Sequence, residues 1–123
     1  MPKSVAVIGA SSNRGKFGNK ALRAFRQQGY TVYAINPNEA TVEGQPTFAS
    51  VLDVPGPIDM ATVYVPAEVG VKVMDEIASK GIREVWLNPG ADAPDVVARA
   101  DALGLKAIQA CSIIAIGDSP SRY

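Results

Sequence analysis

The sequence predicts a single α/β domain in which a doubly wound, mainly parallel sheet of five strands is covered by helices on both faces. Short runs rich in β-branched residues alternate with longer segments of helical periodicity, which is typical of repeated βαβ units. The strand candidates are apolar over most of their length, as expected of strands that are buried on both faces. A chain of 123 residues is long enough for one core without disulfides, so we treat residues 1–123 as one domain.

The first half of the chain supplies two strands and one helix. A strand over 4–8 leads through a glycine-rich loop into a helix over 16–28, whose apolar residues recur at helical spacing and which a glycine ends. A second strand covers 31–35. The polar stretch after it is interrupted by prolines, and we expect it to be irregular apart from a short helical turn over 49–52.

The second half continues the alternation of strands and helices. In chain order we expect a strand over 60–65, a helix that begins after Pro66 and stops at Gly81, a strand over 84–87, a helix capped by Asp92 that stops at Gly104, and a fifth strand over 106–109. The tail over 111–123 mixes an apolar patch with Gly, Ser and Pro. We expect it to pack across the sheet and then fray.

Charge and cysteine content exclude several classes of protein. Lysine plus arginine equal aspartate plus glutamate at twelve each, so no overall field attracts nucleic acid or anionic lipid. Cys111 is the single cysteine, which rules out an internal disulfide and favours a reducing compartment. We find no signal peptide and no apolar run long enough to cross a bilayer. The sequence therefore predicts a cytoplasmic protein with neither a nucleic-acid nor a membrane partner.

Four unusual loops follow the carboxyl ends of the predicted strands. They are residues 9–18, 36–38, 66–67 and 88–90, all rich in small residues, prolines or amides. The carboxyl ends of parallel strands share one edge of a sheet, and ligands of doubly wound sheets bind beyond that edge. We therefore expect these loops to converge on a ligand site.

The first of these loops is suited to an anion. Small residues let backbone N–H groups approach a phosphate, and the helix that follows presents the positive end of its dipole. Ser11, Ser12 and Asn13 add neutral donors, while Arg14 and Lys16 add positive charge. The loop predicts a phosphate-binding site.

The spacing of the loop glycines bears on the identity of the nucleotide. Gly9, Gly15 and Gly18 do not form the G-x-G-x-x-G dinucleotide fingerprint, because Ser11 stands where the second glycine belongs. Asn36 and Asn38 follow the second strand, in place of the acidic residue that usually binds the ribose of NAD. A nucleotide with an additional ribose phosphate therefore fits better than NAD. An NAD(P)-binding oxidoreductase or redox sensor stays the alternative.

Several short motifs together resemble the CoA-binding domain family. They are V-I-G-A-S at 7–11, G-K-F-G-N at 15–19, A-I-N-P at 34–37, V-Y-V-P-A at 63–67 and V-W-L-N-P-G at 85–90. That family includes small stand-alone bacterial proteins and the amino-terminal domain of the succinyl-CoA synthetase alpha subunit. The resemblance covers almost the whole chain and implies a Rossmann-like fold with coenzyme A as the cofactor.

The resemblance also implies where the parts of CoA lie. Residues 11–15 would wrap the phosphates, Asn38 would lie near the ribose and its phosphate, 65–67 would border the adenine or pantetheine, and 88–90 would line the thiol end. The full set of expected cofactor-binding residues is Gly9, Ser11, Ser12, Asn13, Arg14, Gly15, Lys16, Phe17, Gly18, Asn36, Pro37, Asn38, Val65, Pro66, Ala67, Asn88, Pro89 and Gly90. The synthetase has a lysine close to Asn38, and this departure weakens the expectation of tight 3′-phosphate binding.

The chain offers little that resembles catalytic machinery. It contains no histidine, so the phosphohistidine chemistry of the synthetase does not carry over, and neither an acid–base pair nor a metal centre is expected. Cys111 follows the fifth strand and is either a small buried residue or a thiol able to form a mixed disulfide with CoA. We expect a non-catalytic module that binds CoA or an acyl-CoA. A homo-oligomer, or a cofactor subunit of an acyl-CoA enzyme, stays open, as does the acyl group.

Overall fold

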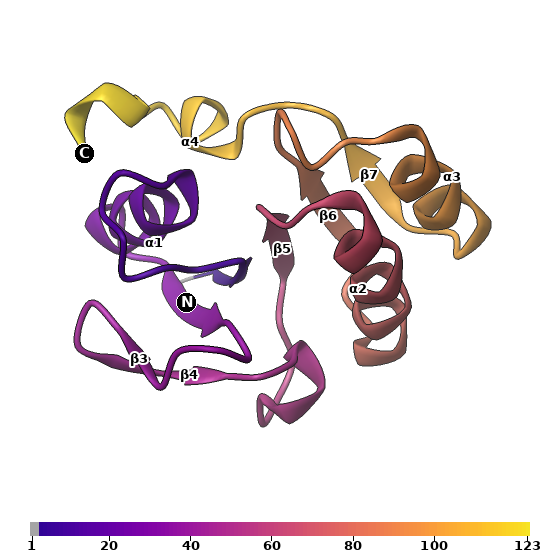
Figure 1. Ribbon diagram of the computed structural model, residues 1–123, viewed down its shortest axis with the longest axis horizontal. Coiled ribbons are helices and arrows are strands. Elements are labelled where there is room, and N and C mark those ends of the chain that lie inside the picture. Colours follow the sequence, from indigo (N-terminus) through magenta and orange to yellow (C-terminus); the bar gives the residue numbers. More distant parts are fainter. Residues whose placement is uncertain (1–2) are drawn as a thin grey trace.

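The computed structural model describes residues 3–123 and confirms a Rossmann-like α/β fold with a mainly parallel sheet (Figure 1). Within these residues the sheet has the spatial order β3-β4-β2-β1-β5-β6-β7. The strands are β1 (Ser4–Ile8), β2 (Thr31–Ile35), β3 (Thr41–Val42), β4 (Gln45–Phe48), β5 (Met60–Val63), β6 (Glu84–Leu87) and β7 (Lys106–Ile108). The helices are α1 (Phe17–Gln27), α2 (Ala67–Lys80), α3 (Pro94–Ala102) and α4 (Ser112–Ala115), with short 3-10 turns η1 (Val51–Asp53) and η2 (Pro120–Arg122).

The described part of the chain forms a sheet of seven strands, so the expectation of five strands is wrong. The additional two, β3 and β4, form an antiparallel hairpin in the stretch that we expected to be irregular, and β4 continues the parallel sheet beside β2. Figure 1 shows this hairpin at the edge of the sheet opposite β7. Glu43 and Gly44 make its two-residue turn, both with positive φ (49° and 78°). Glu-Gly is an uncommon pair for such a turn, so the turn itself was not recognisable in the sequence. Because β3 has only two residues, it also shows no alternation of apolar and polar side chains.

The helices cover both faces of the sheet because side chains alternate along each strand. On β1, Val5 and Val7 pack on one face with Leu22 and Phe25 of α1, while Ala6 and Ile8 pack on the other face among residues of α2 and α3. Leu22, Phe25 and the α2 side chains Met74 and Ile77 are fully buried. Burial of each such side chain contributes about 1.5–3 kcal/mol, which fixes each helix against its face.

Two local expectations need correction. The third predicted strand ends at Val63 rather than at residue 65, which leaves Tyr64 and Val65 in a loop. Asp92 does not cap α3: the cap position is Ala93, and the Asp92 carboxylate accepts the Gly90 N–H at 3.3 Å.

The tail packs on the sheet as expected, but it does not fray. Ile113 is fully buried against the α1 face, and η2 brings the chain end back to α1. There the Tyr123 hydroxyl donates to Asp118 at 2.5 Å. Among residues 3–123 no helix is both long and apolar enough to span a membrane.

Candidate functional site

A large pocket lies at the point where the strand order of the sheet reverses. β1 and β5 are parallel neighbours, but the helix after β1 packs on one face and the helix after β5 packs on the other. The connections therefore diverge and leave a crevice at the carboxyl ends of these two strands, the usual ligand position in doubly wound sheets. The crevice has a volume of about 1110 Å³ and is lined by the loops after β1, β2, β5 and β6, by α2, and by residues beside η1.

Gly9 and Gly18 shape the floor of this pocket because any side chain there would meet backbone. A Cβ on Gly18 would lie 2.1 Å from the Gly9 carbonyl oxygen, so the start of α1 rests directly on the end of β1. Gly9 has φ +93°, and a Cβ there would lie 2.7 Å from the backbone carbonyl oxygen of Tyr64 in the loop after β5. Gly15 is different, since its nearest neighbour would be the Asn13 side-chain oxygen at 3.3 Å.

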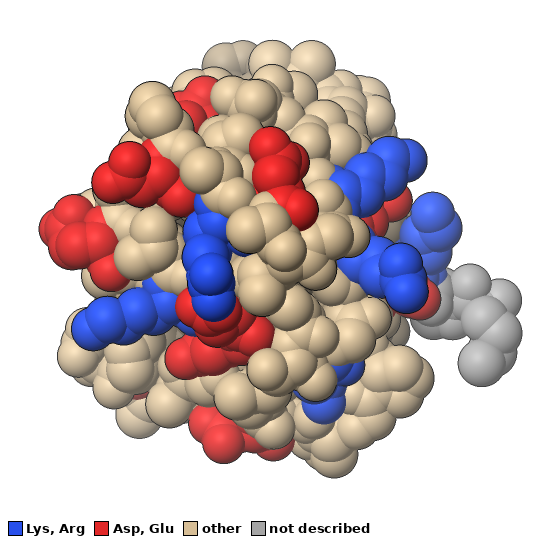
Figure 2. Space-filling model, turned by 90° about the vertical axis from the view of Figure 1, so that its right-hand side faces the viewer, with Lys and Arg blue, Asp and Glu red and all other residues tan. Residues whose placement is uncertain are grey.

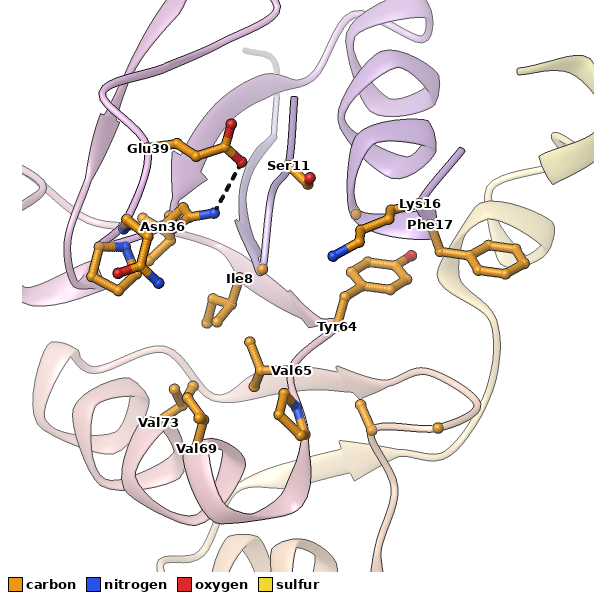
Figure 3. A pocket seen from close by; sticks show the side chains of 18 of the residues that line it. Ile8, Ser11, Lys16, Phe17, Asn36, Glu39, Tyr64, Val65, Val69 and Val73 are labelled. Carbon is orange, nitrogen blue, oxygen red and sulfur yellow. Dashed lines mark hydrogen bonds between the residues drawn. The ribbon is translucent and has the colours of Figure 1, made fainter. Parts of the chain in front are cut away.

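The structure brings most of the expected site residues together. Those that line the pocket are Gly9, Ser11, Gly15, Lys16, Phe17, Gly18, Asn36, Pro37, Asn38, Val65, Pro66, Pro89 and Gly90. Figure 3 shows Lys16 reaching toward the pocket centre, above Tyr64, while the ring of Phe17 points away from it. The remaining expected residues, Ser12, Asn13, Arg14, Ala67 and Asn88, do not line the pocket.

Arg14 turns away from the pocket toward the hairpin. Its guanidinium donates to both carboxylate oxygens of Glu43, at 2.8 and 3.1 Å, and Asn19 of α1 donates to the same carboxylate at 3.0 Å. The hydrogen bonds from Arg14 and Asn19 lower the pKa of Glu43 to about 2. Arg14 therefore connects the glycine-rich loop to the β3–β4 hairpin, and no pattern in the sequence predicts this contact.

Backbone donors of the loop are also largely used within the protein. The Asn13 N–H donates to the Ser11 hydroxyl at 3.1 Å, the Gly15 N–H to the Asn13 side chain at 2.9 Å, and the Ser12 N–H to the Glu39 carboxylate at 3.1 Å. These bonds fix the shape of the loop. The parts of it that face the pocket are its two ends, near Gly9 and near Lys16.

Asn88 is a structural residue of the β6 loop. It is 1% exposed, and its amide donates to Thr62 at 2.7 Å and to the Val63 carbonyl at 3.1 Å. Its oxygen accepts the Ser112 N–H at 2.9 Å. Asn88 thus joins β5, β6 and the start of α4 behind the pocket, and this satisfies polar groups that would otherwise be buried without partners.

Tyr64 connects this buried network to the pocket. Its hydroxyl lies 3.1 Å from the Ser112 hydroxyl, and its ring lines the pocket wall. Burial raises the pKa of Tyr64 above its ordinary value, so the phenol stays neutral at physiological pH. Cys111, next to Ser112, is half-buried.

Further pocket residues, on α2 and after β2, were not among the expected site residues. The α2 residues are Val69, Lys72, Val73 and Glu76, whose spacing of three and four places them on one side of the helix. Ile8, Ile35, Ala49, Val51 and Ala91 add apolar wall. The helical spacing of Val69 and Val73 was visible in the sequence, but it indicated only a core face.

Glu39 is the most important of the missed residues, and it corrects the expectation that no acidic residue follows the second strand. Its carboxylate accepts the N–H and the hydroxyl of Ser12 and, at 3.3 Å, the Asn36 amide (Figure 3). The bonds from Ser12 lower the pKa of Glu39, with a smaller contribution from the charge of Lys16. Glu39 is visible in the sequence three residues after Asn36. It was missed because the NAD fingerprint places its acidic residue directly at the end of the second strand.

Two lysines give the pocket positive charge. Lys16 at the start of α1 and Lys72 on α2 are both exposed and line the pocket, and neither forms an ion pair within the part of the chain that the structure describes. Elsewhere the charges are mixed: on the face shown in Figure 2, Lys and Arg alternate with Asp and Glu. Within residues 3–123 no cluster of three or more His, Cys, Asp or Glu side chains could hold a metal ion.

This chain is similar in sequence to known CoA-binding domains. The protein-family model of the CoA binding domain matches residues 3–117 of this chain. The chain is 42% identical over 81 residues to an ADP-forming acetate–CoA ligase of Archaeoglobus fulgidus, covering 66% of this chain and 12% of the ligase. It is 38% identical over 90 residues to the alpha subunit of an ADP-forming acetate–CoA ligase of Pyrococcus furiosus, covering 68% of this chain and 20% of that subunit. The chain therefore spans only a small part of these relatives.

Solved structures agree with the fold. A conserved hypothetical protein of Pyrococcus furiosus superposes with a TM-score of 0.81 at 27% identity, covering 94% of this chain and 99% of that one. The apo form of a dinucleotide-forming acetyl-coenzyme A synthetase of Ca. Korarchaeum cryptofilum superposes with a TM-score of 0.75 at 28% identity, covering 89% of this chain and 26% of that one. With a family match over nearly its whole length, a switch-point pocket and a glycine-rich loop, this chain belongs to the CoA binding domain family.

Proposed function

We propose that this domain binds coenzyme A or an acyl-CoA in the switch-point pocket and acts as a non-catalytic binding module. The observation that carries the proposal is the combination, in one pocket of about 1110 Å³, of a long apolar wall with two lysines that form no ion pair among residues 3–123. Single-ligand pockets usually measure 300–1,000 Å³, so this one has room for a nucleotide with an extended arm.

The two halves of such a ligand have matching surroundings. Lys16 and the positive end of α1 stand where a diphosphate would cross the glycine-rich loop. The adenine would lie on the apolar wall formed by Ile35, Val51 and Val73, and the pantetheine would run past Tyr64 toward the β6 loop. This assignment keeps 13 of the residues expected from the sequence in contact with the ligand and leaves Arg14 and Asn88 as supports.

A thermal-shift panel with CoA, acetyl-CoA, NAD, NADP and FAD tests the proposal. A ligand at 100 times its Kd stabilises the folded state by about 2.7 kcal/mol, which for a domain of this size raises Tm by about 10 °C. We expect this for CoA and acetyl-CoA alone. Stabilisation by NAD and none by CoA would overturn the proposal.

Charge variants locate the site. Lys16→Ala and Lys72→Ala each remove a cation that faces the pocket, so each should weaken CoA binding by about fivefold to tenfold. Lys106→Ala is the matched control, because Lys106 is exposed at the opposite end of the strands and should not alter affinity. Equal affinity in all three variants would place the ligand elsewhere.

Two other functions each have one observation in their favour. The Glu39 carboxylate after β2 favours NAD, and the panel above decides between NAD and CoA. The similarity to the alpha subunit of a two-subunit ligase favours a cofactor subunit of an acyl-CoA enzyme. Affinity purification of the chain from its native source, with CoA present, should recover an acyl-CoA enzyme if that second function holds.

A further inference from the structure

Glu39 places a fixed negative charge at the β2 end of the pocket. Its carboxylate is held by the Ser12 N–H and hydroxyl and by the Asn36 amide. Its own backbone carbonyl accepts the hydroxyl of Thr47 on β4. A swing of the side chain away from the pocket would break the Ser12 and Asn36 hydrogen bonds, so the charge cannot be moved without loss of stability.

The surroundings of Glu39 identify the part of a nucleotide that would face it. In doubly wound sheets the ribose of the bound nucleotide lies at the end of the second strand. Here that position is bordered by Asn36, Pro37, Asn38 and Glu39, between the glycine-rich loop and the apolar wall of Val51 and Val73. A phosphate on the ribose would enter the field of the Glu39 carboxylate, whereas free ribose hydroxyls would not be repelled.

The two lysines of the pocket differ in how far they can offset the negative charge of Glu39. Lys16 lies on the far side of Ser11 from Glu39 (Figure 3), where a diphosphate would use it. Lys72 is on α2, one turn from Glu76, whose carboxylate accepts the Ser50 hydroxyl at 2.8 Å. At the β2 end of the pocket the carboxylates of Glu39 and Glu76 thus lie on two different walls, and Lys72 is the lysine that accompanies them.

We propose that Glu39 is a specificity-determining residue that acts against a phosphate on the adenosine ribose, so that this site takes dephospho-CoA-type ligands at least as well as CoA. The inference rests on the proposed function. It assigns to this chain a preference within the CoA class, set by Glu39 where Asn38 supplies no positive charge.

Calorimetric titration of CoA and dephospho-CoA into the wild-type chain and into Glu39→Gln tests the inference. The wild type should bind the two ligands with Kd values within about threefold of each other. Glu39→Gln keeps the shape and removes the charge, and it should raise CoA affinity about tenfold relative to dephospho-CoA, as expected for one charge acting on a phosphate through partly solvated space. Glu68→Gln, an exposed carboxylate on α2 that does not line the pocket, is the control for net charge and should leave the ratio unchanged.

The outcomes separate this inference from its alternatives. An equal gain for both ligands in Glu39→Gln would mean that Glu39 only competes with the diphosphate for Ser12, and it would overturn the proposal, as would an unchanged ratio. If neither CoA ligand binds the wild type, the proposed function fails, and the same comparison is made with NAD and NADP, which differ by a ribose phosphate. An unchanged NADP to NAD ratio in Glu39→Gln, or no binding of either, would then overturn the role of Glu39.

Discussion

Gly18→Ala is the substitution for which the structure predicts the clearest result. The added Cβ would lie 2.1 Å from the Gly9 carbonyl oxygen, whereas ordinary contacts begin near 3.4 Å. The oxygen is a backbone atom and the backbone of α1 fixes the position of the Cβ, so α1 and the end of β1 must separate by about 1 Å. Overpacking of this kind costs up to about 3 kcal/mol, and the better helix propensity of alanine offsets up to about 1 kcal/mol. A net loss of about 2 kcal/mol lowers Tm by about 8 °C.

Differential scanning calorimetry measures this change, and Gly15→Ala in the same loop is the matched control. There the nearest neighbour of a Cβ would be the end of the flexible Asn13 side chain, and φ is not positive, so Tm should change by no more than about 2 °C. Gly18→Ala should also weaken CoA binding, because it displaces the start of α1 at the pocket floor. A Tm for Gly18→Ala within about 2 °C of that for Gly15→Ala would refute the close packing of Gly18 on Gly9.

Three further predictions follow from the buried and paired side chains. Because Arg14 and Asn19 hold the pKa of Glu43 at about 2 against an ordinary 4.5, its contribution to stability is complete above pH 4.5 and is lost as pH falls toward 2. Discounted for solvent screening, Glu43→Gln should cost about 1 kcal/mol at pH 7 and nothing near pH 2 in urea titrations, and a pH-independent difference would contradict this reasoning. Asn88→Ala should lower the free energy of unfolding by about 3 kcal/mol, since it leaves buried polar groups unpaired, and a loss below 1 kcal/mol would show that water replaces the amide. The thiolate of Cys111 should attack CoA disulfide and release one CoA thiolate, so intact mass under non-reducing conditions should gain one CoA unit; an unchanged mass contradicts this.

Local patterns in the sequence predicted the main helices of this fold. Helical spacing of apolar residues predicted α1 and α2 to within a residue or two of their observed bounds, and a glycine that ends the helix is confirmed by the left-handed Gly81. The β3–β4 hairpin was missed because its strands are two and four residues long and its pairing, not its composition, defines it. The Asp92 cap was wrong because Ala93 and Pro94 already set the start of α3.

Three features could be predicted from the sequence alone: the order of strands and helices, the convergence of the strand-end loops at one edge, and a loop suited to an anion between β1 and α1. Which side chains of that loop face the pocket depends on the tertiary structure. It directs Arg14 to Glu43, holds Glu39 against Ser12, and brings Lys72 of α2 into the pocket that Lys16 also lines. Spacing along the chain shows the periodicity of a helix or a strand, and so it predicts local structure. The contacts of Glu39 and Glu43 join residues 27 or more positions apart, and they depend on the order and register of the strands. Packing of buried side chains on both faces of the sheet selects that order and register.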